Sequence, residues 1–188
     1  RGAERARVVA PIERDLVLLG LGGTVGTGGK PLRGEIAVVE SLEEIAARGE
    51  ALRGKIVVIN QAMPAFDHDG HRSFYGETVK IRSSGASEAA KLGAKAVLIR
   101  SVTANSLRSP HTGAVRYDEE APKIPAAAVT LEDAELLARL ARRGKATVEL
   151  SLGAKTLPDS ESGNAIAELR GRELPDEIVV IGGHIDSW

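Results

Sequence analysis

The sequence predicts a mixed α/β protein, with a twisted and partly closed β-sheet flanked by about three helices. Short apolar runs typical of strands alternate with amphipathic helical segments from Arg7 to Leu152. The composition is rich in small and aliphatic residues, and aromatic residues make up only 3% of the chain. Side chains of this kind favour close packing of helices on a sheet.

The apolar runs predict the strands. The runs at 55–60 and 96–99 are continuous, which indicates strands buried on both faces, whereas 145–152 alternates as a half-buried strand does. Glycines at 20–29 predict a loop between the second and third strands. The predicted strands, in chain order, are 7–10, 16–19, 35–39, 55–60, 96–99, 126–129 and 145–152.

Helix-capping signals predict three helices. Ser41 is followed three residues later by Glu44, which is a capping box, and Thr130 with Asp133 gives a similar signal. The helices are expected from about 42 to 49, from 84 to 92 and from 131 to 143, and each ends at or before a glycine. Strand, helix and strand between 55 and 99 predict a right-handed crossover between neighbouring strands.

Composition excludes several classes of function. The net charge is −1, so no electrostatic argument favours nucleic acid or an anionic membrane. No apolar run approaches the roughly 20 residues that span a bilayer. Cysteine is absent, so disulfides do not stabilise the fold and thiol usage does not indicate a compartment. The sequence begins at Arg1 without a methionine, and we expect it to come from a longer protein.

The C-terminal residues carry the main candidate chemistry. A polar segment, 157–163, predicts a linker, and two further strands are expected at 164–169 and 177–181 in a separate sheet. The second of these strands leads through two glycines to His184 and Asp186, which share one side if the backbone is extended. An imidazole is a good zinc ligand and a carboxylate can orient it. From the spacing alone, a buried strand followed by a polar turn is the favoured interpretation of this short pattern.

Seven short motifs follow one another along the chain: Arg1–Glu4, Gly20–Thr27, Arg53–Val58, Ser109–Gly113, Lys123–Thr130, Asn164–Leu169 and Gly182–Trp188. In this order and spacing they resemble the di-zinc aminopeptidases, and among them the carboxypeptidase Q group. The resemblance covers nearly the whole chain.

The resemblance implies a secreted-type zinc exopeptidase that hydrolyses short peptides with a water activated by two zinc ions. His184 matches a zinc ligand, and Asp186 matches the carboxylate behind the metals that orients their ligands. The other ligands and the general-base glutamate match no residue up to Trp188. We therefore expect this chain alone to be inactive and to bind zinc weakly or not at all.

The resemblance also implies an organisation. Residues 1–19 would form an edge piece of the peptidase domain, 20–162 an inserted protease-associated domain, and 163–188 the start of the catalytic domain. The expected partners are a peptide substrate, the rest of the catalytic domain and, through unpaired strand edges, another copy of the chain. The expected location is extracellular or periplasmic. The alternative is a self-standing protease-associated interaction module without catalysis.

Two other segments contain residues of the kind that bind a metal or a nucleotide. Asp67, His68, Asp69 and His71 could hold a metal, although a solvated loop is the favoured interpretation. The glycines of 20–25 follow a strand as in a dinucleotide loop, but Val25 occupies the third glycine position and no helix follows promptly. A turn between elements is therefore the favoured interpretation there as well.

Overall fold

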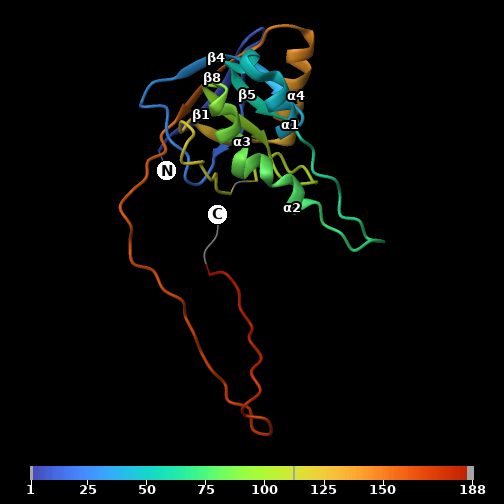
Figure 1. Cartoon of the computed structure of the whole chain (residues 1–188), viewed down its shortest axis with the longest axis vertical. Coiled ribbons are helices and arrows are strands. Elements are labelled where there is room, and N and C mark those ends of the chain that lie inside the picture. Colours follow the sequence, from blue (N-terminus) through green and yellow to red (C-terminus); the bar gives the residue numbers. More distant parts are fainter. Residues whose placement is uncertain (1, 112, 186–188) are drawn as a thin grey trace. The chain divides into compact units, whose positions relative to one another are not determined.

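The computed structural model describes residues 2–111 and 113–185. The chain divides into two units, Arg1–Thr156 and Leu157–Trp188. The larger unit contains all the helices and strands of the described residues (Figure 1). No helix in these ranges combines the length and the apolar character needed to cross a bilayer.

One mixed, eight-stranded sheet organises the larger unit, in the order β2-β1-β8-β4-β5-β6-β7-β3. Neighbours from β4 to β7 are parallel, and the remaining pairs are antiparallel. The predicted fold class is confirmed. The strands are β1 (Glu4–Ala10), β2 (Arg14–Leu16), β3 (Leu18–Gly20), β4 (Leu32–Val39), β5 (Ile56–Ile59), β6 (Ala96–Arg100), β7 (Ala126–Val129) and β8 (Thr147–Leu152).

The two edges of this sheet are joined through Val17. The segment 16–19, predicted as one strand, is divided there, because β2 pairs with β1 whereas β3 pairs with β7 at the other end of the sheet. A hydrogen bond also joins β3 to β1, since the N–H of Gly20 donates to the carboxylate of Glu4 at 2.9 Å. The sheet is therefore nearly closed, with few unpaired edge groups.

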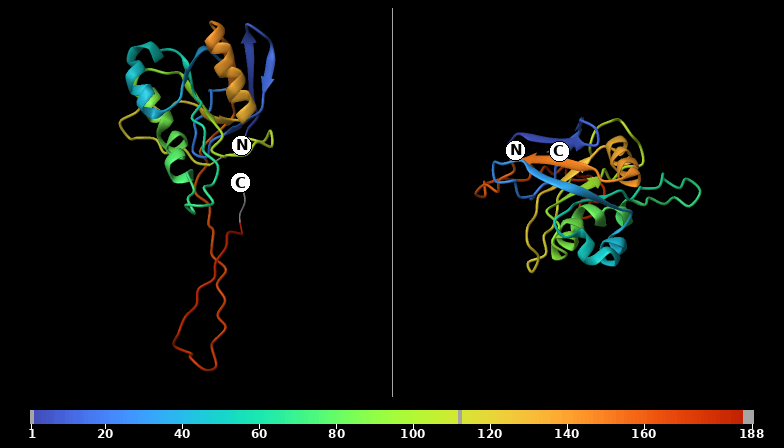
Figure 2. Two further views of the ribbon diagram at one scale, coloured as in Figure 1. Left: turned by 90° about the vertical axis from the view of Figure 1, so that its right-hand side faces the viewer. Right: turned by 90° about the horizontal axis from the view of Figure 1, so that it is seen from above.

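Helices cover both faces of the sheet. α1 and α3 pack on one face and α4 packs on the other (Figure 2). The helices are α1 (Leu42–Arg48), the 3-10 helix η1 (Gly49–Leu52), α2 (Tyr75–Thr78), α3 (Lys80–Lys91) and α4 (Leu131–Arg143).

The predicted caps at Ser41 and Thr130 are both present, whereas the start of the second helix differs from the prediction. Ser41 accepts a hydrogen bond from the N–H of Glu44 at 3.2 Å, and the Glu44 carboxylate accepts one from the N–H of Glu40 at 2.7 Å. The predicted start of the second helix at 84 is wrong, because α3 begins at Lys80 directly after α2 and has no side-chain cap. The helical hydrogen bonds of α2 continue into it instead.

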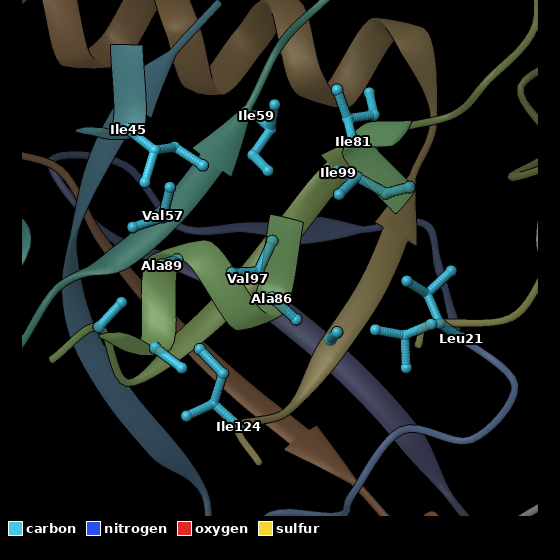
Figure 3. Packing of buried hydrophobic residues seen from close by; sticks show 14 of the residues in the cluster. Leu21, Ile45, Val57, Ile59, Ile81, Ala86, Ala89, Val97, Ile99 and Ile124 are labelled. Carbon is cyan, nitrogen blue, oxygen red and sulfur yellow. The ribbon is translucent and has the colours of Figure 1, made fainter. Parts of the chain in front are cut away.

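Buried aliphatic side chains form one cluster on each face of the sheet. Side chains of α1 and α3 meet alternate residues of the central strands in the first cluster, as Figure 3 shows for Ile45, Ala86, Ala89, Val57 and Val97. The second cluster lies under α4 and includes the other residues of the same strands. All four residues of β5 are fully buried, as the continuous apolar run predicts.

The smaller unit has no helix or strand in its described residues, 157–185. The predicted strands at 164–169 and 177–181 do not form a ladder here, and their apolar side chains are exposed: Ile166 is 90% and Ile181 93% accessible. A pair of isolated strands is marginally stable in water unless another layer covers one face. The domain boundaries at 19 and 162 stay predictions, although β1, β2 and β3 lie in the sheet of the larger unit.

Candidate functional site

The predicted zinc ligand His184 is exposed, in a segment that faces the start of the smaller unit. Residues 162–165 and 182–185 together line an open cavity of about 790 Å³. Gly182 and Gly183 have no heavy atom within 4 Å of the position a Cβ would take, so the backbone before the imidazole is uncrowded. Asp186, the second predicted site residue, lies outside the described residues.

The donors in the described ranges do not by themselves complete a zinc site. Zinc in proteins takes three or four nitrogen, sulfur or oxygen ligands from side chains. Within 2–111 and 113–185, no group of three or more histidine, aspartate or glutamate residues is placed to share an ion. His184 can therefore supply one neutral imidazole, and any zinc bound there requires donors from elsewhere.

The acidic and histidine-rich loop at 67–71 is a hairpin turn. Asp67 pairs with Arg72 in an antiparallel bridge. The Asp67 carboxylate accepts hydrogen bonds from the N–H groups of Asp69 and Gly70, at 3.1 and 3.0 Å. His68 packs its ring edge-on against Phe66, with 5.0 Å between the ring centroids. The carboxylate thus stabilises its own turn, as in an Asx turn.

The glycine-rich loop after β3 is a junction within the sheet. No helix follows it, since the next element is β4. Thr24 is buried in this loop, and its hydroxyl accepts a hydrogen bond from the N–H of Ala126 at 2.8 Å. A dinucleotide loop would end at a helix N-terminus, so the turn interpretation agrees with the structure.

A polar network lies at the carboxyl ends of the parallel strands, and the sequence analysis missed it. The buried Asn60 donates to Glu40 at 3.2 Å and accepts from Arg100 at 3.2 Å. Arg100 also forms an ion pair with Glu135 of α4. Glu40, Asn60 and Arg100 each directly follow an apolar run, which is the signal that could have identified them. The network ties α4 to the ends of β4, β5 and β6.

His111 lies in the long loop after β6, beside α2 and α3. Its backbone N–H donates to Ser101 at 2.9 Å, and its ring approaches Tyr75 edge-on with 6.3 Å between centroids. Partial burial, with a smaller contribution from the positive charge of Arg82, lowers the pKa of His111 below its usual value. The imidazole is therefore held in its neutral form further into the acidic range.

A family model described as PA domain matches residues 12–137. This chain belongs to the PA domain family. The match includes β2 to β7, α1, α3 and the first half of α4, so the PA domain and the sheet described above largely coincide.

Carboxypeptidase Q proteins are similar to this PA-domain chain over its whole length, which confirms the predicted resemblance. The identity is 46% for the protein from Xenopus laevis, 44% for that from Homo sapiens and 48% for that from Rattus norvegicus, each over 189 aligned residues. The alignments cover 100% of this chain and 38% of each relative. The chain therefore spans well under half of the length of these relatives.

Solved structures of peptidases share the fold. A peptidase M28 precursor from Shewanella amazonensis superposes with a TM-score of 0.74 and 35% identity, over 81% of this chain and 34% of that one. An aminopeptidase from Aneurinibacillus superposes with a TM-score of 0.51 at 19% identity, over 80% of this chain and 30% of that one. The second likeness shows the fold alone.

Proposed function

We propose that this chain is the PA domain and the start of the catalytic domain of a zinc exopeptidase that resembles carboxypeptidase Q and hydrolyses short peptides. The observation that supports the proposal is the identity of 43–48% to carboxypeptidase Q proteins, which extends over 100% of the chain. It therefore includes the segment with His184 and Asp186, beyond the PA-domain match that ends at residue 137.

In this proposal His184 donates a neutral imidazole nitrogen to zinc, and Asp186 orients the ligands from behind the metals. Two zinc ions would supply a water deprotonated near neutral pH and would polarise the carbonyl of the peptide bond. The remaining ligands and the general base would come from sequence beyond this chain. The chain alone would then be inactive, since one imidazole holds zinc weakly.

The exposed apolar side chains of the smaller unit support its assignment to a larger domain. Residues 178–181 are 84–93% accessible, although a run of this kind is typical of a buried strand. We propose that residues 163–188 begin the catalytic domain, that residues 20–162 form the PA insert, and that residues 1–19 form an edge piece of the peptidase domain. For the complete protein we propose an extracellular or periplasmic location, from the same resemblance.

The test compares the longer protein with this chain. We expect the longer protein to bind about two zinc ions and to release amino acids from di- and tripeptides, whereas this chain does neither. His184→Ala in the longer protein should lower both zinc content and hydrolysis, and His68→Ala, which changes an exposed loop histidine, should lower neither. A folded longer protein without zinc or hydrolysis would favour the interaction module without catalysis.

A further inference from the structure

Half of one edge of β4 is not covered by another strand in the described part of the chain. β8 pairs with β4 from Leu32 to Glu35, and β5 pairs with the opposite edge from Ile36 to Val39. Beyond the contact between Ile36 and Ala146, no strand continues beside the second half of β4 on the β8 side.

Backbone groups of Val38 face this open half-edge. The N–H of Asn60 in the β5 chain donates to the carbonyl of Val39 at 2.8 Å, and the N–H of Ile36 donates on the other side to Ala146 at 2.9 Å. Successive peptide groups of a strand alternate in direction. The N–H and C=O of Val38 therefore point the same way as those of Ile36, away from β5. Arg48 of α1 donates to the Val38 carbonyl at 3.4 Å, at the exposed rim.

A groove follows this half-edge between α1 and α4. Its volume is about 400 Å³, and its lining includes residues 35–38 together with Ala138 and Ala141 of α4. The two helices lie on opposite faces of the sheet (Figure 2), so the edge of β4 forms the floor between them. The volume lies in the range of pockets that bind small ligands.

The cations that line the groove differ in whether they have an ion-pair partner. Arg142 of α4 lines it, and no carboxylate of the described residues lies within ion-pair distance of this guanidinium. The other two cations of the lining are paired, Arg48 with Glu44 at 2.7 Å and Lys55 with Glu35 at 2.6 Å. A partner with a carboxylate near Arg142 would supply the charge that is absent there.

We propose that the open half-edge of β4 binds an extended peptide segment that carries an acidic side chain. The peptide backbone would donate to the carbonyl of Val38 and accept from its N–H, as in other cases of strand addition. The acidic side chain would pair with Arg142. Glu40 also lines the groove and disfavours a second acid beside it, so the position of the acid sets the direction of the peptide.

The test uses the 188-residue chain and dye-labelled, acetylated and amidated pentapeptides of alternating valine and threonine, with glutamate at one end and lysine at the other. Both orders of the termini are synthesised. We expect one order to bind more tightly and to slow the hydrogen exchange of the Val38 N–H, measured by NMR. A peptide N-methylated at alternate residues should bind about tenfold more weakly, because it cannot form the main-chain bonds.

Two charge reversals in the last turn of α4 test the partner's charge. Arg142→Glu should weaken binding about fivefold, whereas Arg143→Glu, which removes an exposed cation outside the groove, should leave it unchanged. The proposal is overturned if neither peptide order slows exchange at Val38, or if both reversals weaken binding equally. If neither peptide slows exchange, the charged residues around the edge of β4 serve only to prevent its pairing with another strand.

Discussion

Replacing Asp133 by alanine should open the point at which the sheet of the larger unit closes on itself. Asp133 is 1% exposed in the first turn of α4. Its carboxylate accepts a hydrogen bond of 2.7 Å from the N–H of Val17, the residue that joins the two edge strands. Its own N–H donates to Thr130 at 3.2 Å. Asp133 therefore links the start of α4 to the residue at which the two edges of the sheet meet.

The expected loss follows from this single bond. A hydrogen bond to a charged group contributes about 2 kcal/mol, and its removal leaves the Val17 N–H without its acceptor. The free energy of unfolding should therefore fall by about 2 kcal/mol, which for a protein of this size lowers Tm by about 4–8 °C. Asp133→Asn keeps an acceptor oxygen but loses the charge, and should cost about 1 kcal/mol.

The assay is urea unfolding followed by far-UV circular dichroism. Fluorescence does not suit it, because the single tryptophan, Trp188, lies outside the larger unit. Glu132→Ala is the matched control, since it removes a first-turn carboxylate that is exposed and does not contact Val17; it should cost clearly less than Asp133→Ala.

The reasoning fails if Asp133→Ala and Glu132→Ala are equally stable. It also fails if Asp133→Asn loses as much as Asp133→Ala, because the charge alone would then account for the effect. Unchanged m-values in the series would show that the variants share one folded state.

Three further measurements test the packing, the pH response and the smaller unit. Gly85→Val should cost about 2 kcal/mol in urea unfolding, because a Cβ at Gly85 would lie 2.5 Å from Cδ1 of Ile59, whereas Gly76→Val meets no atom and should cost much less. Because the pKa of His111 is lower in the folded chain than in the unfolded chain, the unfolded chain binds the proton at higher pH, and the free energy of unfolding should fall as the pH drops below about 6.5. His111→Gln should make the free energy of unfolding depend less on pH in this range. The same pH dependence in both proteins would contradict the role of His111. Amides of 178–181 should exchange rapidly in this chain and slowly in the longer protein, and equal rates would argue against a catalytic sheet.

The larger unit could be predicted well where local signals decide the structure. Continuous apolar runs predicted β5 and β6, and capping residues predicted α1 and α4. The division at Val17 could not be predicted, because it depends on pairing with strands that are distant in sequence: Leu16 lies opposite Ala6, and Leu18 opposite Val129. A local pattern contains no information about such partners.

The candidate site was predicted less completely than the fold. His184 was selected by its motif and its resemblance to a family, and the geometry of the described residues adds no second ligand. The network of Glu40, Asn60 and Arg100 carried a local signal, namely a polar residue at the carboxyl end of each apolar run. Such a signal identifies an end of a strand, but only the sheet order brings the three residues together.

A repeated tetrapeptide shows how strongly context decides the structure. Residues 56–59 and 178–181 have the same sequence, Ile-Val-Val-Ile. The first copy is β5, with each side chain 0% exposed between two parallel neighbours, and the second copy is 84–93% exposed without a strand partner. Since the local β propensity is identical, the difference comes from the neighbours alone. The second copy therefore needs strands and helices on its flanks to be buried, and a catalytic domain of the proposed kind would supply them.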